Sequence, residues 1–437
     1  MRYLVFLLFL LTGSGRSMAQ SKIEDYLSAI VELNSFSGSV VVAVGNEVLL
    51  NRGFGKADFE LDVNNTSKTV HRIGSLTKQF TSMGILKLFD EIDTISINDQ
   101  LGGLVPGLPE DWQEITIFQL LTHTSGIPNY FGDLDVVPVE DTYKEIRKVI
   151  EMEKYNPRGL RKVPGSEFRY SNFGYVMLGY IIEFVSGQDY FDYLNKVIFT
   201  PLSMDQAYYD DPRMLIPGRS EGYKFSDAQL VNDALKDPAG YAAGGMLSST
   251  EDMLKWRAAL TSDVIIDAEL RGRMFDPYLE NYGLGWTIVE RNERARYDHN
   301  GGTHGYNSRI VYYPEEEVFI AILGNNEDVR SATITCVIEG LIFNETDPFL
   351  SLAYTFDMSA FEKFVGEYGN DTDGKRSIEV VEGKPHYVNG KSRFEIVQQT
   401  ENSFRFAKYR EFKIEFAEED GFTLSTCAVN PRIFKRR

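Results

Sequence analysis

The sequence predicts an α+β fold: a central antiparallel sheet flanked by helices, with an inserted helical lobe, followed by a small antiparallel β domain. Three observations support this prediction. Strand-like hairpins lie at both ends of residues 39–324, helical patterns fill the stretch between them, and short alternating runs follow residue 361. Because each element must bury its apolar face, this order favours one sheet closed by the two ends of the region.

The first hairpin is predicted from two apolar runs, Ser39–Val44 and Val48–Gly53. They flank Gly45-Asn46, a pair suited to the positive φ angles of a tight hairpin turn. Apolar residues alternate again late in the same region, around turn-forming residues. The strands expected there are Trp286–Glu290, Ala295–Asp298, Ser308–Tyr313 and Val318–Gly324.

Helices are predicted from apolar residues spaced three or four apart and from capping residues at their ends. Thr116 and Ser249 are suited to the start of a helix, and Gly187 to the left-handed position that ends one. The expected helices are Ile23–Leu33, Ser75–Asp90, Thr116–Thr124, Phe173–Ser186 and Ser249–Leu260. The last four would supply the helices around the sheet and the helical lobe.

The chain changes character near residues 344–348, after which short alternating runs are separated by polar or glycine-containing turns. This pattern is typical of a separate antiparallel β domain. We therefore expect a first domain at 20–345, a linker at 346–360 and a β domain at 361–437. The strands expected in it are Ser377–Val381, His386–Val388, Phe394–Gln398, Phe404–Lys408, Phe412–Phe416 and Phe422–Cys427.

Composition excludes some classes of function. The 437 residues carry a net charge of −19, which disfavours nucleic-acid binding because that needs a basic surface. The only two cysteines, Cys336 and Cys427, are too few for a disulfide-rich secreted scaffold. We expect two buried thiols rather than a bridge, although the sequence does not decide whether they pair.

Residues 1–19 have the features of a cleaved signal peptide. Arg2 precedes an apolar run at 3–11, and Ser17-Met18-Ala19 forms a small-x-small cleavage site before Gln20. The apolar run is too short for a bilayer, which needs about 20 residues. The sequence therefore predicts an exported protein, periplasmic or extracellular, without a stable membrane span after cleavage.

Ser75 and Lys78 form the first motif that can carry chemistry. On a helix their side chains emerge from one face, and Ser75 would lie at the helix N-terminus, where free N–H groups favour negative charge. Burial lowers the pKa of a lysine from about 10.4 by as much as ~3–5 units, so the amine could take or relay a proton. Taken alone, the pattern is better explained by an N-cap serine and a solvated lysine.

Two further segments are weak signals by themselves. Tyr170–Asn172 precedes an apolar helix, so Ser171 could simply be its N-cap. The glycine-rich segment 299–302 allows a strand to approach a ligand closely, but turn glycines would look the same. A metal site at His299 and His304 is disfavoured, because their spacing and neighbours do not match those of metal ligands.

In this order, the three motifs together resemble the active-site motifs of serine β-lactamases and penicillin-binding proteins. Residues 72–78, 120–128, 244–252 and 298–302 add to the likeness, which extends over residues 23–343. The resemblance is greatest to class C enzymes, D,D-peptidases and related esterases. It implies the β-lactamase/transpeptidase-like fold, and the last domain resembles the lipocalin-like barrel that some relatives carry.

The resemblance implies a role for each catalytic residue. Ser75 would be the nucleophile that forms an acyl-enzyme. Tyr170 would act as general base toward Ser75 and later toward water, while Lys78 would hold the proton network. No metal and no cofactor would take part. His123, within the family-like stretch 120–128, is expected to satisfy backbone groups rather than to catalyse.

The remaining site residues would bind substrate. Asn172 would hydrogen-bond the substrate amide, and His299 and Gly301 would line the site. The backbone N–H groups of Ser75 and Gly302 would form the oxyanion hole, which is typically worth ~3–4 kcal/mol per donor. His299 stands where antibiotic-hydrolysing relatives carry lysine, and a neutral imidazole anchors a carboxylate less well, which argues against strong β-lactamase activity.

The predicted function is therefore hydrolysis, through an acyl-enzyme, of an ester, amide, D-amino-acid peptide or β-lactam carbonyl. One alternative is an esterase without peptidase or β-lactamase activity. Another is a non-catalytic binding or scaffold protein, which is disfavoured because Ser75, Lys78 and Tyr170 are all present. The expected partners are a small-molecule or peptide substrate and further copies of the chain. For the β domain we favour packing and homo-oligomerisation over narrowing of the cleft or binding of a glycan or peptide.

Overall fold

The computed structural model describes residues 13–32, 35–106, 108–129, 159–211, 213–226, 229–233, 240–344, 361–370, 374–390, 392–400, 402–406, 413–417, 421–426 and 429–436. The chain divides into two compact units. The first contains Phe36–Ser331, and the second contains the described parts of Phe9–Ser35 and Ala332–Arg437. The predicted linker at 346–360 lies outside the described residues, and the predicted domain boundaries stay predictions.

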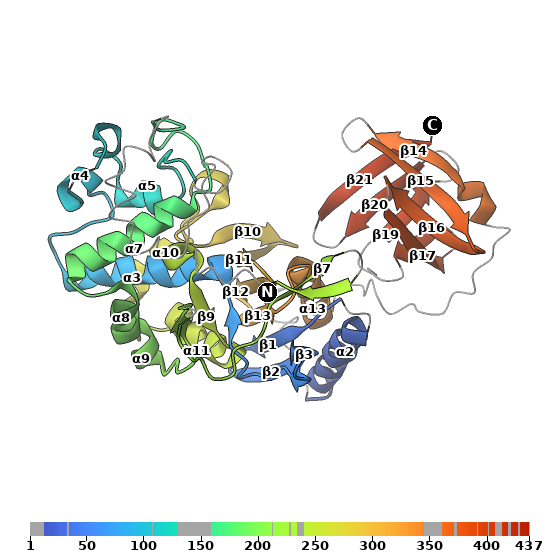
Figure 1. Ribbon diagram of the computed structural model, residues 1–437, viewed down its shortest axis with the longest axis horizontal. Helices are drawn as coiled ribbons and strands as arrows, with labels where there is room; N and C mark the ends of the chain where they lie inside the picture. Colours follow the sequence, from blue (N-terminus) through green and yellow to red (C-terminus); the bar gives the residue numbers. More distant parts are fainter. Residues whose placement is uncertain are drawn as a thin grey trace, which may run out of the picture. The chain divides into compact units, whose positions relative to one another are not determined.

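A six-stranded antiparallel sheet forms the centre of the first unit, in the order β10-β11-β12-β13-β1-β2 (Figure 1). The first strand pairs with the last along its whole length, Gly38 opposite Gly324 and Val44 opposite Val318. The prediction of one sheet closed by the ends of the region is thus confirmed. The strands are β1 (Gly38–Val44), β2 (Glu47–Phe54), β10 (Thr287–Arg291), β11 (Arg294–Thr303), β12 (Tyr306–Tyr313) and β13 (Val318–Gly324).

The centre of this sheet is apolar on both faces. Every residue of β1 and of β13 is buried, which explains why their sequences are nearly unbroken runs of valine, isoleucine and alanine. Helix α11 (Thr250–Thr261) packs against β1 and β13. Its start was predicted correctly, since the side chain of Ser249 accepts a hydrogen bond from the N–H of Asp252.

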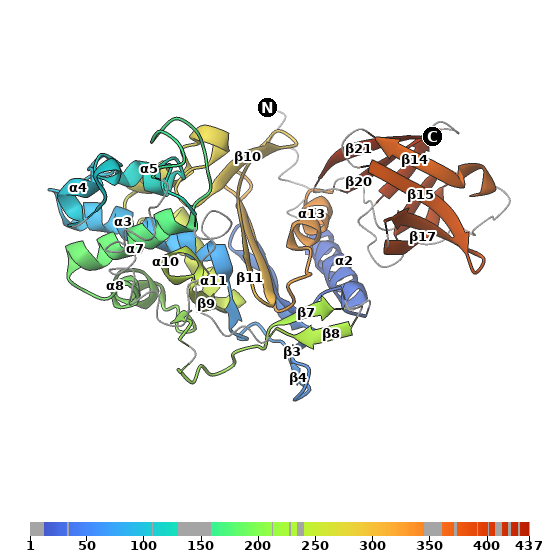
Figure 2. The same cartoon turned by 45° about the horizontal axis from the view of Figure 1, so that its top comes forward.

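The helical lobe lies on one side of this sheet (Figure 2) and is built around α3 (Thr77–Glu91) and α7 (Asn172–Ser186). As predicted, Gly187 ends α7 in the left-handed region, with φ 67°. Ser171 caps its start by accepting a hydrogen bond from the N–H of Gly174. The short helix α10 (Tyr241–Gly244) packs against both α3 and α7.

Helix α5 (Ile117–Leu121) is shorter than the predicted Thr116–Thr124. Its start is as expected, because Thr116 forms a reciprocal capping box with Gln119. It ends early because His123 adopts a left-handed conformation with φ 57°, which an α-helix cannot continue.

Smaller elements complete the first unit. They include a three-stranded sheet, two short hairpins and several helical turns, none of which the sequence predicted. Their bounds are β3 (Lys56–Asp58), β4 (Val63–Asn64), β5 (His71–Arg72), β6 (Tyr208–Tyr209), β7 (Tyr223–Ser226), β8 (Gln229–Asn232), β9 (Met246–Ser248), α4 (Leu101–Leu104), α8 (Tyr190–Leu194), α9 (Thr200–Leu202) and α12 (Ala268–Gly272).

The second unit contains α2 (Gly13–Glu32), α13 (Ser331–Ile342) and a closed eight-stranded antiparallel barrel. The six predicted strands are present, and two more, β14 and β21, close the barrel by pairing with each other. Aromatic side chains such as Phe404 and Phe416 fill the barrel interior. The strands are β14 (Gly366–Asn370), β15 (Gly374–Val381), β16 (Lys384–Asn389), β17 (Ser392–Thr400), β18 (Ser403–Phe406), β19 (Lys413–Ala417), β20 (Gly421–Thr426) and β21 (Val429–Arg436).

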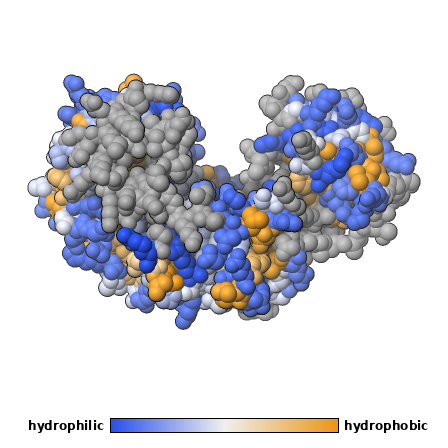
Figure 3. Space-filling view, viewed as in Figure 1, coloured by the Kyte–Doolittle hydropathy of each residue, from blue (hydrophilic) through white to orange (hydrophobic). Residues whose placement is uncertain are grey.

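The prediction of two thiols is wrong for Cys336, on α13, which is buried and disulfide-bonded. Cys427 lies outside the described residues. Among the described residues, no helix combines the length and the apolar character that crossing a bilayer would require. On the face drawn in Figure 3, hydrophilic residues cover most of the described surface, in keeping with a chain that is 25% charged.

Candidate active site

Ser75 lies in a short 3₁₀ helix, η1 (Gly74–Leu76), which leads from β5 directly into α3. Gly74 has φ +53°, and a Cβ on it would meet the backbone of Gly302 at 3.0 Å. Only glycine therefore allows this turn to lie so close to β11. As predicted from the sequence, Ser75 is placed at the N-terminal end of a helix.

Lys78 lies one helical turn after Ser75, and its side chain is fully buried. Its amine is 3.0 Å from the Ser75 hydroxyl oxygen, 2.8 Å from Oδ1 of Asn172 and 2.7 Å from the carbonyl oxygen of Ala243. All three neighbours are uncharged. Because burial disfavours the ammonium form, the pKa of Lys78 lies well below its ordinary value.

Tyr170 approaches the same pair from the segment that precedes α7. Its ring centre is 4.8 Å from the Lys78 amine, and its hydroxyl forms a hydrogen bond with Ser75. Burial raises the pKa of Tyr170, while the hydrogen bond with Ser75 lowers it by less. The phenol is therefore protonated at neutral pH, a condition that the sequence did not reveal.

Asn172 joins this group at the first residue of α7. Its Oδ1 accepts from Lys78, so its amide nitrogen is left to donate, and no described residue accepts from it. The backbone N–H of Asn172 donates to Oδ1 of Asn129, 3.1 Å away, which fixes its position. The structure thus brings Ser75, Lys78, Tyr170 and Asn172 together from two separate segments.

His123 holds the tyrosine segment in place, as expected for a residue that satisfies backbone groups. Its Nδ1 accepts from the N–H of Ser171 at 3.1 Å, and its carbonyl accepts from the N–H of Arg169 at 2.8 Å. These bonds flank Tyr170 on both sides, and the Tyr170 ring packs 4.1 Å from the imidazole centre. Burial, with a smaller effect of the Lys78 charge, lowers the pKa of His123 well below its ordinary value.

His299, on β11, is placed at this site but is buried and fully hydrogen-bonded. Its Nδ1 lies 2.7 Å from the carbonyl oxygen of Asn300, and its Nε2 lies 2.9 Å from the hydroxyl of Tyr282. A carbonyl can only accept, so Nδ1 carries the proton and Nε2 accepts from Tyr282. Burial above all, helped by the charge of Lys78, lowers the pKa of His299 to about 4.

Gly301 and Gly302 bring the end of β11 against η1, the turn that carries Ser75 (called the serine turn below). A Cβ on Gly301 would overlap the carbonyl oxygen of Ile73, whereas a Cβ on Gly302 would meet nothing within 4 Å. The hydroxyl of Ser308 donates to the carbonyl of Ile73 at 2.7 Å, which ties β12 to the segment before Ser75. Gly301 is thus required for close packing, and Gly302 borders open space next to Gly74.

A family model called Beta-lactamase matches residues 23–334. The chain belongs to the Beta-lactamase family. This is a family of serine hydrolases. The fold of the first unit, and the place of the three motifs in it, agree with that assignment.

Two relatives from Bacillus subtilis are similar to this chain. One is penicillin-binding protein 4*, 26% identical over 432 residues that cover 91% of this chain and 94% of the relative. The other is the putative penicillin-binding protein PbpX, 28% identical over 70% of this chain and 73% of the relative.

Two solved structures share the fold. An octameric penicillin-binding protein homologue from Pyrococcus abyssi has a TM-score of 0.68 and 24% identity, covering 95% of this chain and 99% of that chain. The D-amino acid amidase from Ochrobactrum anthropi, solved with L-phenylalanine amide, has a TM-score of 0.62 and 24% identity, covering 70% and 91%. At these identities the likeness concerns the fold.

Two groups in this Beta-lactamase family site were missed from the sequence. The Ala243 carbonyl accepts from Lys78, and the small residues at 242–245 were the only hint of a close backbone approach. Tyr282 is buried, lies against His123 and Tyr170, and donates to His299. Nothing in the residues around it distinguishes it from a core aromatic.

Proposed function

We propose that this chain hydrolyses an ester or amide through an acyl-enzyme formed on Ser75. The observation that carries the proposal is the 3.0 Å distance between the Lys78 amine and the Ser75 hydroxyl in a buried, uncharged setting. A nucleophilic serine needs a base within about 2.6–3.2 Å, and burial makes this amine able to serve as one.

In this proposal Lys78, rather than Tyr170, takes the first proton. The pKa of the lysine is lowered and that of the tyrosine is raised, so at neutral pH the amine is the better acceptor. The Ser75 oxygen attacks the carbonyl carbon while its proton moves to Nζ of Lys78. The proton then passes through the Tyr170 hydroxyl to the leaving group as the bond to the carbonyl breaks.

Deacylation reverses these proton transfers. Water attacks the acyl-enzyme as its proton passes through the Tyr170 hydroxyl to the Lys78 amine, and Lys78 then returns a proton to the Ser75 oxygen as it leaves. The backbone N–H groups of Ser75 and Gly302 are proposed as the oxyanion hole. Their support is the contact of Gly74 with Gly302, which places the two segments next to each other.

We expect the substrates to lack a free carboxylate group that residues of β11 would have to bind. The family resemblance places His299 where antibiotic-hydrolysing relatives carry lysine. The His299 imidazole is neutral, and both of its nitrogens are already in hydrogen bonds. Simple esters and amides, including amides of D-amino acids, fit this site better than β-lactams or peptides with a free terminal carboxylate.

The test is labelling with a fluorophosphonate followed by intact mass measurement. We expect one adduct, lost in Ser75→Ala and retained in Ser96→Ala, which removes an exposed serine elsewhere in the first unit. A p-nitrophenyl ester, a D-amino acid amide, a chromogenic cephalosporin and a D-Ala-D-Ala peptide then measure selectivity. Absence of any adduct or turnover would instead favour the non-catalytic binding protein.

We infer that the chain is exported and forms homo-oligomers. Export is supported by the signal-peptide features of residues 1–19, and N-terminal sequencing of secreted protein should begin at Gln20.

Oligomer formation is supported by the octameric Pyrococcus abyssi homologue, which shares the fold over 95% of this chain. Light scattering after size exclusion should then give at least twice the mass of one chain, which is 49.7 kDa before the signal peptide is removed.

A further inference from the structure

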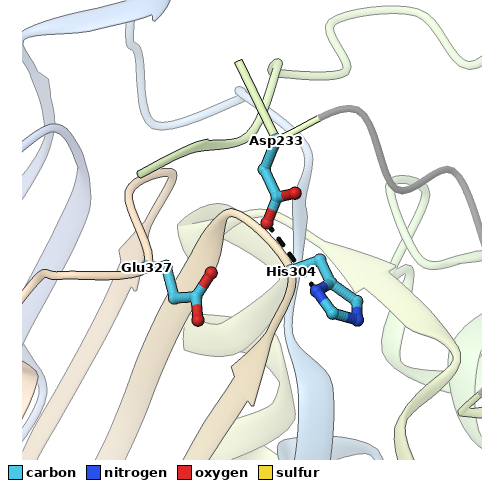
Figure 4. A group of neighbouring side chains, drawn as sticks. All are labelled: Asp233, His304 and Glu327. Atoms are coloured by element: carbon cyan, nitrogen blue, oxygen red, sulfur yellow. Dashed lines mark ion pairs between the residues drawn. The ribbon is translucent and has the colours of Figure 1, made fainter. Parts of the chain in front are cut away.

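Three potential metal ligands meet in the first unit outside the proposed catalytic group (Figure 4). Asp233 follows β8, His304 lies in the turn between β11 and β12, and Glu327 follows β13. One ligand atom from each lies within 4.8 Å of the others, and Nδ1 of His304 is 3.7 Å from Oδ2 of Asp233. In the part of the chain that the structure describes, this is the only such group found.

Backbone hydrogen bonds hold the three segments in register. The N–H of Tyr223 donates to the carbonyl of Gly305, next to the histidine, and its carbonyl accepts from the N–H of Glu327 at 2.8 Å. The N–H of Asp233 donates to the carbonyl of Gly222 at 2.9 Å. The main chain at all three positions is thus fixed around Gly222 and Tyr223, at the start of β7, and only the side chains need to adjust.

The carboxylate of Asp233 supplies the second, independent observation. Its side chain is only 2% exposed, and Oδ2, which points toward His304, has no hydrogen-bond partner among the described residues. A buried carboxylate oxygen without a partner is costly, because burial removes the water that would otherwise solvate it. A cation bound at this oxygen would remove that cost.

Lys224 is the competing explanation. Its amine lies 3.4 Å from the other oxygen of Asp233, Oδ1, and its side chain is 42% exposed. At that distance the ion pair is long, and it leaves Oδ2 unsatisfied. A lysine with this much exposure can turn toward solvent when a stronger cation arrives, so it does not exclude an ion at Oδ2.

We propose that Asp233, His304 and Glu327 bind a divalent transition-metal ion of the Zn²⁺ type. One imidazole and two carboxylates suit Zn²⁺, and the two carboxylates balance its charge. Zinc–ligand distances of about 2.0–2.2 Å imply ligands ~3.4 Å apart in a tetrahedral site, so ligand atoms now within 4.8 Å of one another must close by at most about 1.4 Å. The half-exposed His304 and the exposed Glu327 are able to move that far.

The bound ion would join the ends of β8, β11 and β13 at one point. His304 comes two residues after Gly302, at the end of the strand that approaches Ser75, so the ion would stiffen that end. This role is structural and does not depend on the proposed hydrolase activity. Its test therefore needs no substrate.

The experiment is titration of chelator-treated protein with Zn²⁺ by calorimetry, and with Co²⁺ by visible absorption. We expect one site per chain and a rise in melting temperature of roughly 5 °C at saturating Zn²⁺. His304→Gln and Glu327→Gln should each weaken binding at least about tenfold. Lys224→Met should strengthen it, because the competing cation is gone.

His386→Gln is the matched control, since His386 is a partly exposed histidine on the barrel, in the other unit, and should contribute nothing. Equal Zn²⁺ affinity in wild type and His304→Gln would overturn the proposal, as would the absence of saturable binding in the wild type. Weaker binding in Lys224→Met would show that the lysine belongs to the structure of the site, and would also contradict it.

Discussion

The proton balance between Lys78 and Ser75 gives the first prediction at the scale of single residues. If the neutral amine is the base, fluorophosphonate labelling of Ser75 should rise with pH through the pKa of Lys78. Because burial lowers that pKa, the rise should lie well below the pH of 10.5 expected for a solvated lysine. The measurement is the rate of labelling between pH 5 and 10 by stopped reactions and intact mass.

Two variants separate the roles of the lysine and the tyrosine. Tyr170→Phe should lower the plateau of labelling by about 10²–10⁴-fold without moving its pH midpoint, because the phenol relays the proton but is not the first base. Lys78→Met should remove the pH-dependent rise altogether. If Tyr170→Phe instead abolishes the rise, the tyrosine is the base, as the family resemblance first suggested.

His123 makes a different kind of contribution, because it positions Tyr170 through backbone contacts. His123→Phe keeps a ring next to Tyr170 but leaves the N–H of Ser171 without an acceptor, at a cost of about 1–3 kcal/mol. We expect kcat for the ester to fall more than KM changes, since the tyrosine loses its alignment. Urea unfolding and steady-state kinetics measure the two effects.

His123→Asn is the matched variant for that experiment. Asparagine supplies an oxygen acceptor and tolerates the left-handed backbone, with φ 57° at this position. It should therefore retain more stability and more kcat than His123→Phe. The reverse order would indicate that stacking on Tyr170, and not the hydrogen bond to Ser171, is what matters.

At the scale of elements, the contact between β11 and the serine turn predicts a contrast between neighbouring glycines. Gly301→Ala should destabilise the fold by about 1–3 kcal/mol, because its Cβ would overlap the Ile73 carbonyl and force β11 away from the turn. Gly302→Ala should leave the free energy of unfolding nearly unchanged, since its Cβ would meet nothing within 4 Å. Urea unfolding followed by tryptophan fluorescence compares them, and equal stabilities would contradict the close packing.

The elements predicted correctly are those whose signal is local. The β1–β2 and β12–β13 hairpins have apolar strands around a turn, and α7 and α11 have caps that the sequence displays. The sheet order followed because strands at both ends of a region had to bury their apolar faces together. Ser75, Lys78 and Tyr170 were assigned to one site on a different ground, because their motifs in this order resemble those of serine β-lactamases and penicillin-binding proteins.

The features that were missed depend on tertiary contacts. Helix α5 ends early because His123 turns its backbone to bind the tyrosine segment, a constraint that residues 116–124 do not contain. Strands β14 and β21 carry a weak alternating pattern and are defined by pairing with each other across the barrel closure. The bond from Tyr282 to His299 likewise exists only in the folded site.

At the scale of the whole molecule, buried histidines make stability depend on acid. His71, His123 and His299 are all buried, and burial lowers the pKa of His71 to about 3 from an ordinary 6.5. The unfolded chain therefore binds protons at a pH where the folded chain does not. The stability due to a neutral His71 is complete above pH 6.5 and is lost as pH falls toward 3.

The predicted size of this effect follows from the pKa difference. Between pH 6.5 and pH 4 the unfolded state gains a proton on His71 that the folded state refuses, which costs about 3 kcal/mol of unfolding free energy. His71→Gln can keep hydrogen bonds to Ser39 and Ser220, which lie 3.0 Å from the imidazole nitrogens, but it cannot titrate. Its stability should therefore fall less steeply over this range.

Tryptophan fluorescence can follow this loss in the first unit alone, because Trp112, Trp256 and Trp286, the three tryptophans of the chain, all lie in it. Urea unfolding at pH 7, 6, 5 and 4 gives the change of unfolding free energy with pH for the wild type, for His71→Gln and for His386→Gln, which replaces a partly exposed histidine of the barrel. The last should match the wild type. If His71→Gln also matches it, His71 is not held neutral by the fold, and acid sensitivity must come from the other buried histidines or from carboxylates.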